Sequence, residues 1–135
     1  LIQFNENSID YVNAGHSHVL HKSAVGNNIS ILDYEESIRG PYLGVPLFKT
    51  EYDQYSRKIH SGDFLFIYSD CLFESEFKDN SYREEFGIER VKDAFKNAPT
   101  ESSQKALEYI YNTFKAFIKQ TPLRDDLTAI MIRKK

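Results

Sequence analysis

Residues 63–75 read DFLFIYSDCLFES, an apolar run that is followed directly by a charged residue, Asp70. The stretch from Phe64 to Tyr68 has the composition of a strand that is buried on both faces. Leu72 and Phe73 then resume the apolar character. An ionised carboxylate between two apolar blocks is costly unless it is paired, hydrogen-bonded or bound to a metal. Asp70 therefore requires a chemical explanation.

The composition of the whole chain is that of one globular domain. It has 135 residues, of which 41% are hydrophobic and 27% are charged. A net charge of −3 and a pI near 5.8 give no general attraction to nucleic acid or to an anionic membrane. A single cysteine excludes an internal disulfide and favours a reducing, cytoplasmic compartment. No apolar run is long enough to span a membrane.

The first residue of the chain is Leu1, and its only methionine is Met131. We therefore expect residues 1–135 to be a piece of a longer protein. Further domains are expected to precede this piece.

Short strands are predicted from alternating or continuous apolar residues before and after the run at 64–69. A segment of charged residues and Gly-Pro breakers, from Asp33 to Gly44, predicts a loop. The polar segment from Glu74 to Glu85 predicts irregular structure. The other predicted strands are Ile9–Gly15, Val19–Leu20, Ile29–Leu32, Phe48–Asp53 and Leu127–Ile132. The strand at Phe48–Asp53 is expected to have one solvent-exposed face.

Two helices are predicted between residues 87 and 119. In the first, Ile88, Val91 and Phe95 recur at helical spacing. Thr100 or Ser102 is the expected N-cap of the second. The second helix carries an apolar stripe made of Leu107, Ile110, Tyr111, Phe114, Phe117 and Ile118. The order of strands, two helices and a strand predicts an α+β fold with a mostly antiparallel sheet.

Two aspartates lie at the ends of predicted buried strands. Asp70 ends one strand, and Asp125 precedes another. If these strands pair antiparallel, the two carboxylates lie close together, where they repel unless a cation lies between them. Mg²⁺ and Mn²⁺ prefer such oxygen ligands. Turn capping by each aspartate is the alternative, and the spacing alone does not decide between the two.

Five short motifs, in this order, resemble the C-terminal portion of the SpoIIE-type branch of the metal-dependent serine/threonine protein phosphatases. They are Tyr11-Val-Asn-Ala-Gly-His16, Gly62-Asp63 before an apolar strand, Tyr68-Ser-Asp70, Phe86-Gly87 and Asp125-Asp-Leu-Thr128. The resemblance covers nearly the whole chain. It implies an α/β/β/α sandwich, incomplete at the N-terminus, with helices flanking a mostly antiparallel β-sandwich. It also implies two Mn²⁺ or Mg²⁺ ions that activate a water for attack on phosphoserine or phosphothreonine.

The resemblance also implies roles for individual residues. Asp70 and Asp125 match metal ligands of the family. Asp126, Glu74 and His16 are supporting candidates because they lie within or beside the matching motifs. The family has a further metal-binding Asp-Gly pair on an earlier strand, which has no counterpart in residues 1–135. This piece alone is therefore expected to be inactive.

Cys71 stands where the family has glycine. Glycine permits backbone conformations that cysteine disfavours and leaves space beside the metals. Cys71→Gly is therefore expected to restore the family's turn. The thiol itself is expected to be a small structural residue, and it is counted among the supporting candidates.

The resemblance implies a phosphoprotein substrate in bacterial signalling, such as an anti-anti-sigma factor, and an N-terminal sensory or receiver domain. The net charge and the lack of a long apolar run predict neither a nucleic-acid partner nor membrane contact by this segment. The departure at Cys71 favours an alternative, a degenerate phosphatase fold that binds a regulatory partner without catalysis. A third interpretation is a zinc module, since His16, His18 and His21 include a His-x-His pattern.

Overall fold

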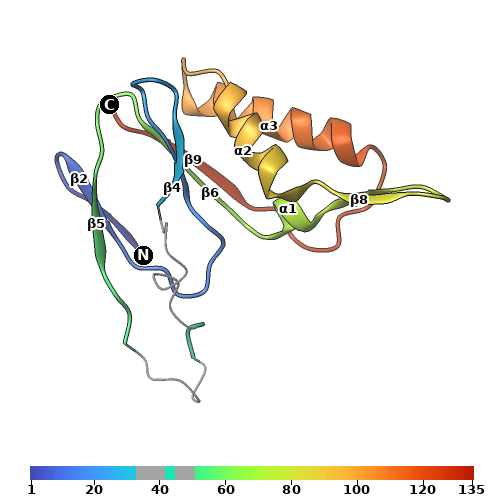
Figure 1. Cartoon of the computed structure of the whole chain (residues 1–135), viewed down its shortest axis with the longest axis horizontal. Coiled ribbons are helices and arrows are strands. Elements are labelled where there is room, and N and C mark those ends of the chain that lie inside the picture. Colours follow the sequence, from blue (N-terminus) through green and yellow to red (C-terminus); the bar gives the residue numbers. More distant parts are fainter. Residues whose placement is uncertain (33–41, 45–50) are drawn as a thin grey trace.

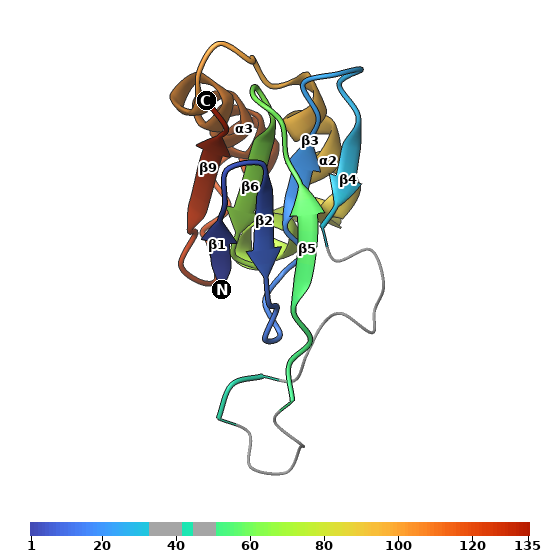
Figure 2. The ribbon, with the colours of Figure 1, turned by 90° about the vertical axis from the view of Figure 1, so that its left-hand side faces the viewer.

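The computed structural model describes residues 1–32, 42–44 and 51–135. Two antiparallel sheets pack face to face, and two long helices cover the outer face of one of them (Figures 1 and 2). The predicted α+β fold with a mostly antiparallel β-sandwich is confirmed. Within the described part of the chain, both long helices lie on the same side of the sandwich.

The first sheet has the order β1 (Ile2–Phe4), β2 (Ser8–Tyr11) and β5 (Tyr55–Lys58). Side chains of β2 alternate, so that Ile9 and Tyr11 are buried while Ser8 and Asp10 are only half-buried. The buried side chains contact Leu65 of the second sheet and form the core between the two sheets.

The second sheet has the order β4 (Ile29–Ile31), β3 (Leu20–Lys22), β6 (Phe64–Tyr68) and β9 (Ala129–Arg133). Strand β6 is internal to this sheet. Phe64, Phe66 and Tyr68 face the helices, whereas Leu65 faces the first sheet. The prediction of a strand buried on both faces is thus confirmed, and its C-terminal end carries Asp70 to the edge of the sandwich.

The helices are α2 (Gly87–Asn97) and α3 (Ser103–Ile118). Their buried residues recur every three or four positions: Val91, Ala94 and Phe95 in α2, and Ala106, Ile110, Phe114 and Ile118 in α3. Ser102 is the N-cap of α3, since its side chain accepts a hydrogen bond from Lys105 N. The assignment of Tyr111 to the buried stripe was wrong, because its side chain is 49% exposed. Neither helix is long and apolar enough for a membrane span, nor is any other described helix.

The prediction of irregular structure from Glu74 to Glu85 was also wrong. A short helix, α1 (Cys71–Glu74), is followed by the hairpin of β7 (Glu76–Lys78) and β8 (Arg83–Glu85), which projects from the body (Figure 1). The Asp79 Oδ1 accepts hydrogen bonds from the N–H groups of Ser81 and Tyr82 and thereby forms the turn.

The predicted strand at Phe48–Asp53 differs from the structure. Its first part lies outside the described residues, as does most of the loop predicted from Asp33. Residues 51–54 are not in a strand, and β5 begins at Tyr55.

Candidate active site

The antiparallel pairing of β6 with β9 brings the two predicted aspartate segments together. Tyr68 pairs with Ala129, and the Ser69 N–H then donates to the carbonyl of Thr128 at 2.9 Å. The Ser69 hydroxyl donates to the carbonyl of Asp126 at 3.1 Å and accepts from the Thr128 N–H at 3.0 Å. The end of β6 and the start of β9 are therefore joined by side-chain as well as main-chain hydrogen bonds.

Asp70 is the N-cap of α1. Its Oδ1 accepts a hydrogen bond from the Cys71 N–H at 2.9 Å, and its side chain is exposed. The high cost of a buried charge is thus avoided, because the chain turns outward at Asp70 before Leu72 re-enters the core.

Asp125 lies in the exposed loop before β9. Its Oδ1 accepts a hydrogen bond from the Asp126 N–H at 2.7 Å. Both aspartates therefore cap a turn with one oxygen. Neither Oδ2 accepts a hydrogen bond from the described residues, so that turn capping and metal binding are compatible in this structure.

The donor set fits part of a site for a hard divalent cation. Exposed carboxylate oxygens are the ligands that Mg²⁺ and Mn²⁺ prefer, and Asp70 and Asp125 supply them on two segments that are in contact. In the described ranges, no three His, Cys, Asp or Glu side chains form a cluster that could hold an ion. Further ligands are therefore required to complete such a site.

Cys71 is the first residue of α1 and is buried. Its Sγ donates to the carbonyl of Asp125 at 3.1 Å and lies 3.6 Å from the Ser75 hydroxyl. The position is helical, and Cys71 is not among the described residues with a positive φ. The local backbone therefore does not require glycine, and the thiol fills the space between the two aspartate segments.

A hollow of about 830 Å³ lies beside Asp70. His16 and Glu74, two of the supporting candidates, line it together with Asp70. Asp125 and Asp126 are not among the residues that line it. Asp126 contributes its carbonyl to Ser69 and its N–H to Asp125.

The position of His16 is set by a tight turn. The Asn13 side chain accepts from the His16 N–H at 2.8 Å and donates to the His16 carbonyl at 3.1 Å. Gly15 has φ +81°, and a Cβ there would lie within 2.5 Å of the Tyr42 ring. The imidazole of His16 is exposed beside the hollow, with its Nδ1 2.9 Å from the Ser17 carbonyl.

His21 does not join His16 and His18 in a zinc site. It lies on β3, and its Nε2 contacts the Asp63 carboxylate at 2.9 Å. Asp63 is 2% exposed and also accepts hydrogen bonds from the N–H groups of Ala24 and His60. Burial alone raises the pKa of Asp63, but these hydrogen bonds and His21 outweigh it and lower the pKa below its ordinary value. In the sequence, Gly62-Asp63 is one of the five motifs of the family resemblance, and no role was predicted for the Asp63 side chain.

Glu76 is a second buried carboxylate that the sequence did not single out. Its side chain is 5% exposed and forms ion pairs with Arg83 and Arg124. Arg124 directly precedes Asp125. In the sequence, Glu76 is one of several acids in a polar segment, and no periodicity marks it as buried.

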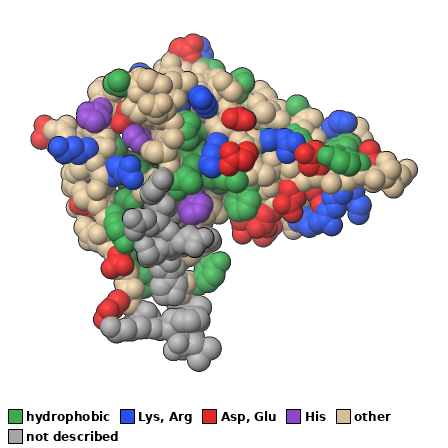
Figure 3. Space-filling view, in the orientation of Figure 1, with side chains coloured by type: hydrophobic (Ala, Val, Ile, Leu, Met, Phe, Trp, Pro, Cys, Tyr) green, Lys and Arg blue, Asp and Glu red, His purple; other side chains and the backbone are tan. Residues whose placement is uncertain are grey.

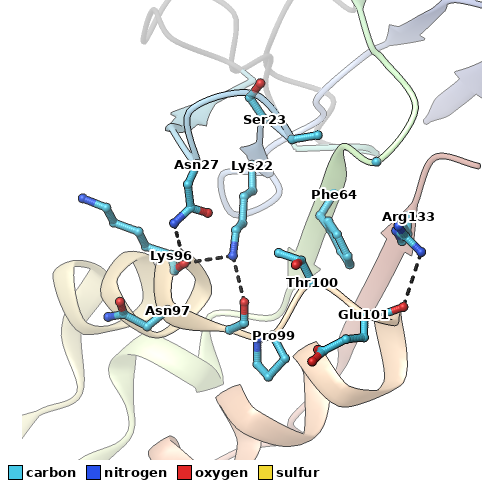
Figure 4. A pocket seen from close by; sticks show the side chains of 13 residues that line it. Lys22, Ser23, Asn27, Phe64, Lys96, Asn97, Pro99, Thr100, Glu101 and Arg133 are labelled. Atoms are coloured by element: carbon cyan, nitrogen blue, oxygen red, sulfur yellow. Dashed lines mark hydrogen bonds between the residues drawn. The ribbon is translucent and has the colours of Figure 1, made fainter.

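A second hollow lies at the opposite end of β6, around Lys22 (Figure 4). The Lys22 ammonium donates to the carbonyls of Phe95, Lys96 and Ala98 at 3.2, 2.8 and 2.9 Å. Burial lowers the pKa of Lys22. Because all three donors are used on the C-terminus of α2, this cation is a helix cap.

Comparison with known proteins gives one family. The family model described as stage II sporulation protein E (SpoIIE) matches residues 1–135. No curated protein sequence matches the chain.

Solved structures share the fold. The SiaA-PP2C domain of Pseudomonas aeruginosa has a TM-score of 0.74 at 16% identity, over 96% of this chain and 47% of that one. The phosphatase domain of the cell fate determinant SpoIIE from Bacillus subtilis, presoaked with Mn, has a TM-score of 0.71 at 16% identity, over 99% and 55%. The RsbU and RsbW domains of a Mycobacterium tuberculosis protein have a TM-score of 0.66 at 21% identity, over 98% and 34%. The chain thus spans about half the length of the first two structures.

Proposed function

The chain belongs to the SpoIIE family of phosphatase domains, and on that premise we propose that it is the C-terminal part of a domain that dephosphorylates serine or threonine in a regulatory protein. The proposed substrate is a phosphoprotein of bacterial signalling, such as an anti-anti-sigma factor. The proposed setting is the cytoplasm, with a sensory or receiver domain N-terminal to the phosphatase domain.

The observation that carries this proposal is the contact between the Asp70 and Asp125 segments. Ser69 and Cys71 connect them through hydrogen bonds to Asp126 and Asp125. In the proposed site, Asp70 and Asp125 are ligands of divalent cations, either Mn²⁺ or Mg²⁺. Two such ions, when bound, acidify a water and neutralise phosphate oxygens.

The residues of this chain have separate tasks in the proposed reaction. The Asp70 and Asp125 carboxylates supply negative charge and Oδ2 atoms that accept no hydrogen bond from the described residues. The hollow beside Asp70 receives the phosphorylated segment, and His16 and Glu74 line it. The water oxygen bonds to phosphorus as the bond from phosphorus to the seryl or threonyl oxygen breaks, so that the products are inorganic phosphate and a free hydroxyl.

Phosphate release from a phosphoserine protein by the full-length protein, measured across a Mn²⁺ titration, tests the proposal. Asp70→Asn and Asp125→Asn should each lower the rate on the order of 100-fold, since small errors in the placement of reacting groups already cost that much. Asp93→Asn, an exposed change on α2, is the matched control and should leave the rate unchanged. Wild-type rates in both Asp70→Asn and Asp125→Asn would contradict the proposal.

Residues 1–135 alone should be inactive in the same assay. Their described part holds no group of three metal-binding side chains, and hydrolysis requires both ions to be held in position. Phosphate release by the isolated chain would show that this set of ligands is sufficient.

A binding module without catalysis is the second candidate function. It is favoured by Cys71, whose side chain is packed against Asp125 where the family has the smaller glycine. For this candidate, the full-length protein would bind its phosphoprotein partner equally well in wild type and Asp70→Asn, with no phosphate release from either.

A further inference from the structure

The environment of Glu76 links the β7–β8 hairpin to the loop that carries Asp125. Glu76 directly follows α1 and Ser75, and its carboxylate is 5% exposed. Two guanidinium groups approach it from the surface: Arg83 is 54% exposed and Arg124 is 60% exposed. A buried carboxylate is stable only with such partners, since breaking a buried pair leaves an uncompensated charge.

The two arginines reach Glu76 from different elements. Arg83 comes from β8, which is paired with β7 in the same hairpin. Arg124 comes from the loop between α3 and β9, 48 residues after Glu76. Of the two ion pairs of Glu76, the one with Arg124 therefore connects separate parts of the chain. Acidic and basic side chains also lie beside one another at this end of the molecule (Figure 3).

Three side chains of residues 69–76 hold the loop before β9. Ser69 binds Asp126 and Thr128, Cys71 binds the carbonyl of Asp125, and Glu76 binds the Arg124 guanidinium. The first two contacts lie on the β9 side of the loop. The contact with Glu76 is made by Arg124, the residue immediately before Asp125. This ion pair therefore holds the loop on the N-terminal side of Asp125.

We propose that Glu76 is a positioning residue that sets the direction of the Asp125 carboxylate through Arg124. The proposal rests on the function proposed above, because it takes Asp125 as a ligand of a divalent cation. Groups that orient a metal ligand change metal affinity by about 10- to 100-fold when they are removed. In this proposal Glu76 acts only through Arg124, by restraining the backbone on the N-terminal side of Asp125, whereas Ser69 and Cys71 hold the side toward β9.

The test uses the full-length protein and compares Arg124→Gln with Arg83→Gln. Each change removes one of the two cations that pair with Glu76, but only Arg124 adjoins Asp125. Mn²⁺ affinity is measured directly, from the electron paramagnetic resonance signal of the free ion. Arg124→Gln should weaken Mn²⁺ binding about 10-fold, whereas Arg83→Gln should change it less than threefold at a comparable loss of melting temperature. If Arg124→Gln does not fold, Arg124→Lys and Arg83→Lys replace the two glutamine variants. The change at Arg124 should again weaken Mn²⁺ binding more than the change at Arg83.

Two results would overturn the inference: wild-type Mn²⁺ affinity in Arg124→Gln, or an equal loss of affinity in both arginine variants. Asp125→Asn separates this failure from that of the proposed function. Loss of Mn²⁺ binding in Asp125→Asn together with normal binding in Arg124→Gln would contradict the positioning role of Glu76 and leave the proposed function intact. Normal binding in Asp125→Asn removes the proposed function as well.

Discussion

The Sγ of Cys71 lies 3.1 Å from the carbonyl oxygen of Asp125, a residue that follows it by 54 positions. This hydrogen bond joins the first residue of α1 to the loop before β9. The thiol therefore has a structural role, and replacing it with glycine removes a contact between these two segments.

Cys71→Gly should destabilise the protein, the opposite of what the family's glycine suggests. Glycine is a poorer helix former than cysteine by less than about 0.5 kcal/mol, and the variant also loses the hydrogen bond to Asp125. The free energy of unfolding, measured in urea, should fall by about 1–2 kcal/mol. Cys71→Ser keeps a donor at this position and should lose less. A more stable glycine variant would show that the thiol contact contributes nothing.

Asp63→Asn should lower the free energy of unfolding by about 3 kcal/mol, the usual result of breaking a buried pair. The ordinary pKa of this carboxyl group is 3.8, and its folded pKa is lower. The contribution of the Asp63 carboxylate to the free energy of unfolding is therefore fully present above about pH 4 and is lost as the pH falls through the folded pKa. Melting curves between pH 7 and pH 2 should show an acid-dependent loss of stability in wild type that is smaller in Asp63→Asn. An unchanged acid dependence would remove Asp63 from this role.

Lys22→Met should destabilise the protein by about 3 kcal/mol. The change leaves three carbonyls at the end of α2 without their charged donor, and hydrogen bonds to charged groups contribute about 1.5–3 kcal/mol each in favourable cases. Lys96→Met is the matched control, because its exposed side chain lies on the same helix end. That variant should stay within about 0.5 kcal/mol of wild type. Equal effects in urea titrations would contradict the capping role.

Phe114→Ala and Tyr111→Ala separate the buried face of α3 from its exposed face. Phe114 is fully buried and its ring contacts Phe86 edge-on, with 5.4 Å between ring centroids. Phe114→Ala should lower the free energy of unfolding by about 3–5 kcal/mol. Tyr111 is about half exposed, so Tyr111→Ala should cost less than about 1 kcal/mol. Thermal unfolding of both variants provides the comparison, and a larger effect at Tyr111 would contradict the packing described here.

The elements that the sequence predicted well are those whose burial is set by a repeating pattern. β6 is a continuous apolar run, and α2 and α3 have apolar residues every three or four positions. Ser102 is a strong N-cap because its hydroxyl can accept a main-chain hydrogen bond. The error at Tyr111 has a physical reason: the tyrosine ring is apolar enough to extend a stripe, yet its hydroxyl makes exposure inexpensive.

The candidate site was predictable only in part. The pairing of two buried strands placed the Asp70 and Asp125 segments together, and the family resemblance supplied their proposed roles. Glu76 and Asp63 were not predictable, because a carboxylate becomes buried only when partners from distant segments reach it. Those partners, Arg124 for Glu76 and His21 for Asp63, lie 48 and 42 residues away.

The capping of α2 by Lys22 has a consequence for the order of folding. The donor precedes the carbonyls it binds by 73 to 76 residues, so that this cap of the last turn of α2 is not a local contact. Closing so long a loop carries an entropic cost, which the pairing of β3 with β6 helps to offset. We therefore expect the N-terminal turns of α2 to form early and its C-terminal turn to become protected only after the sheet has assembled, with the slow kinetics typical of non-local pairing.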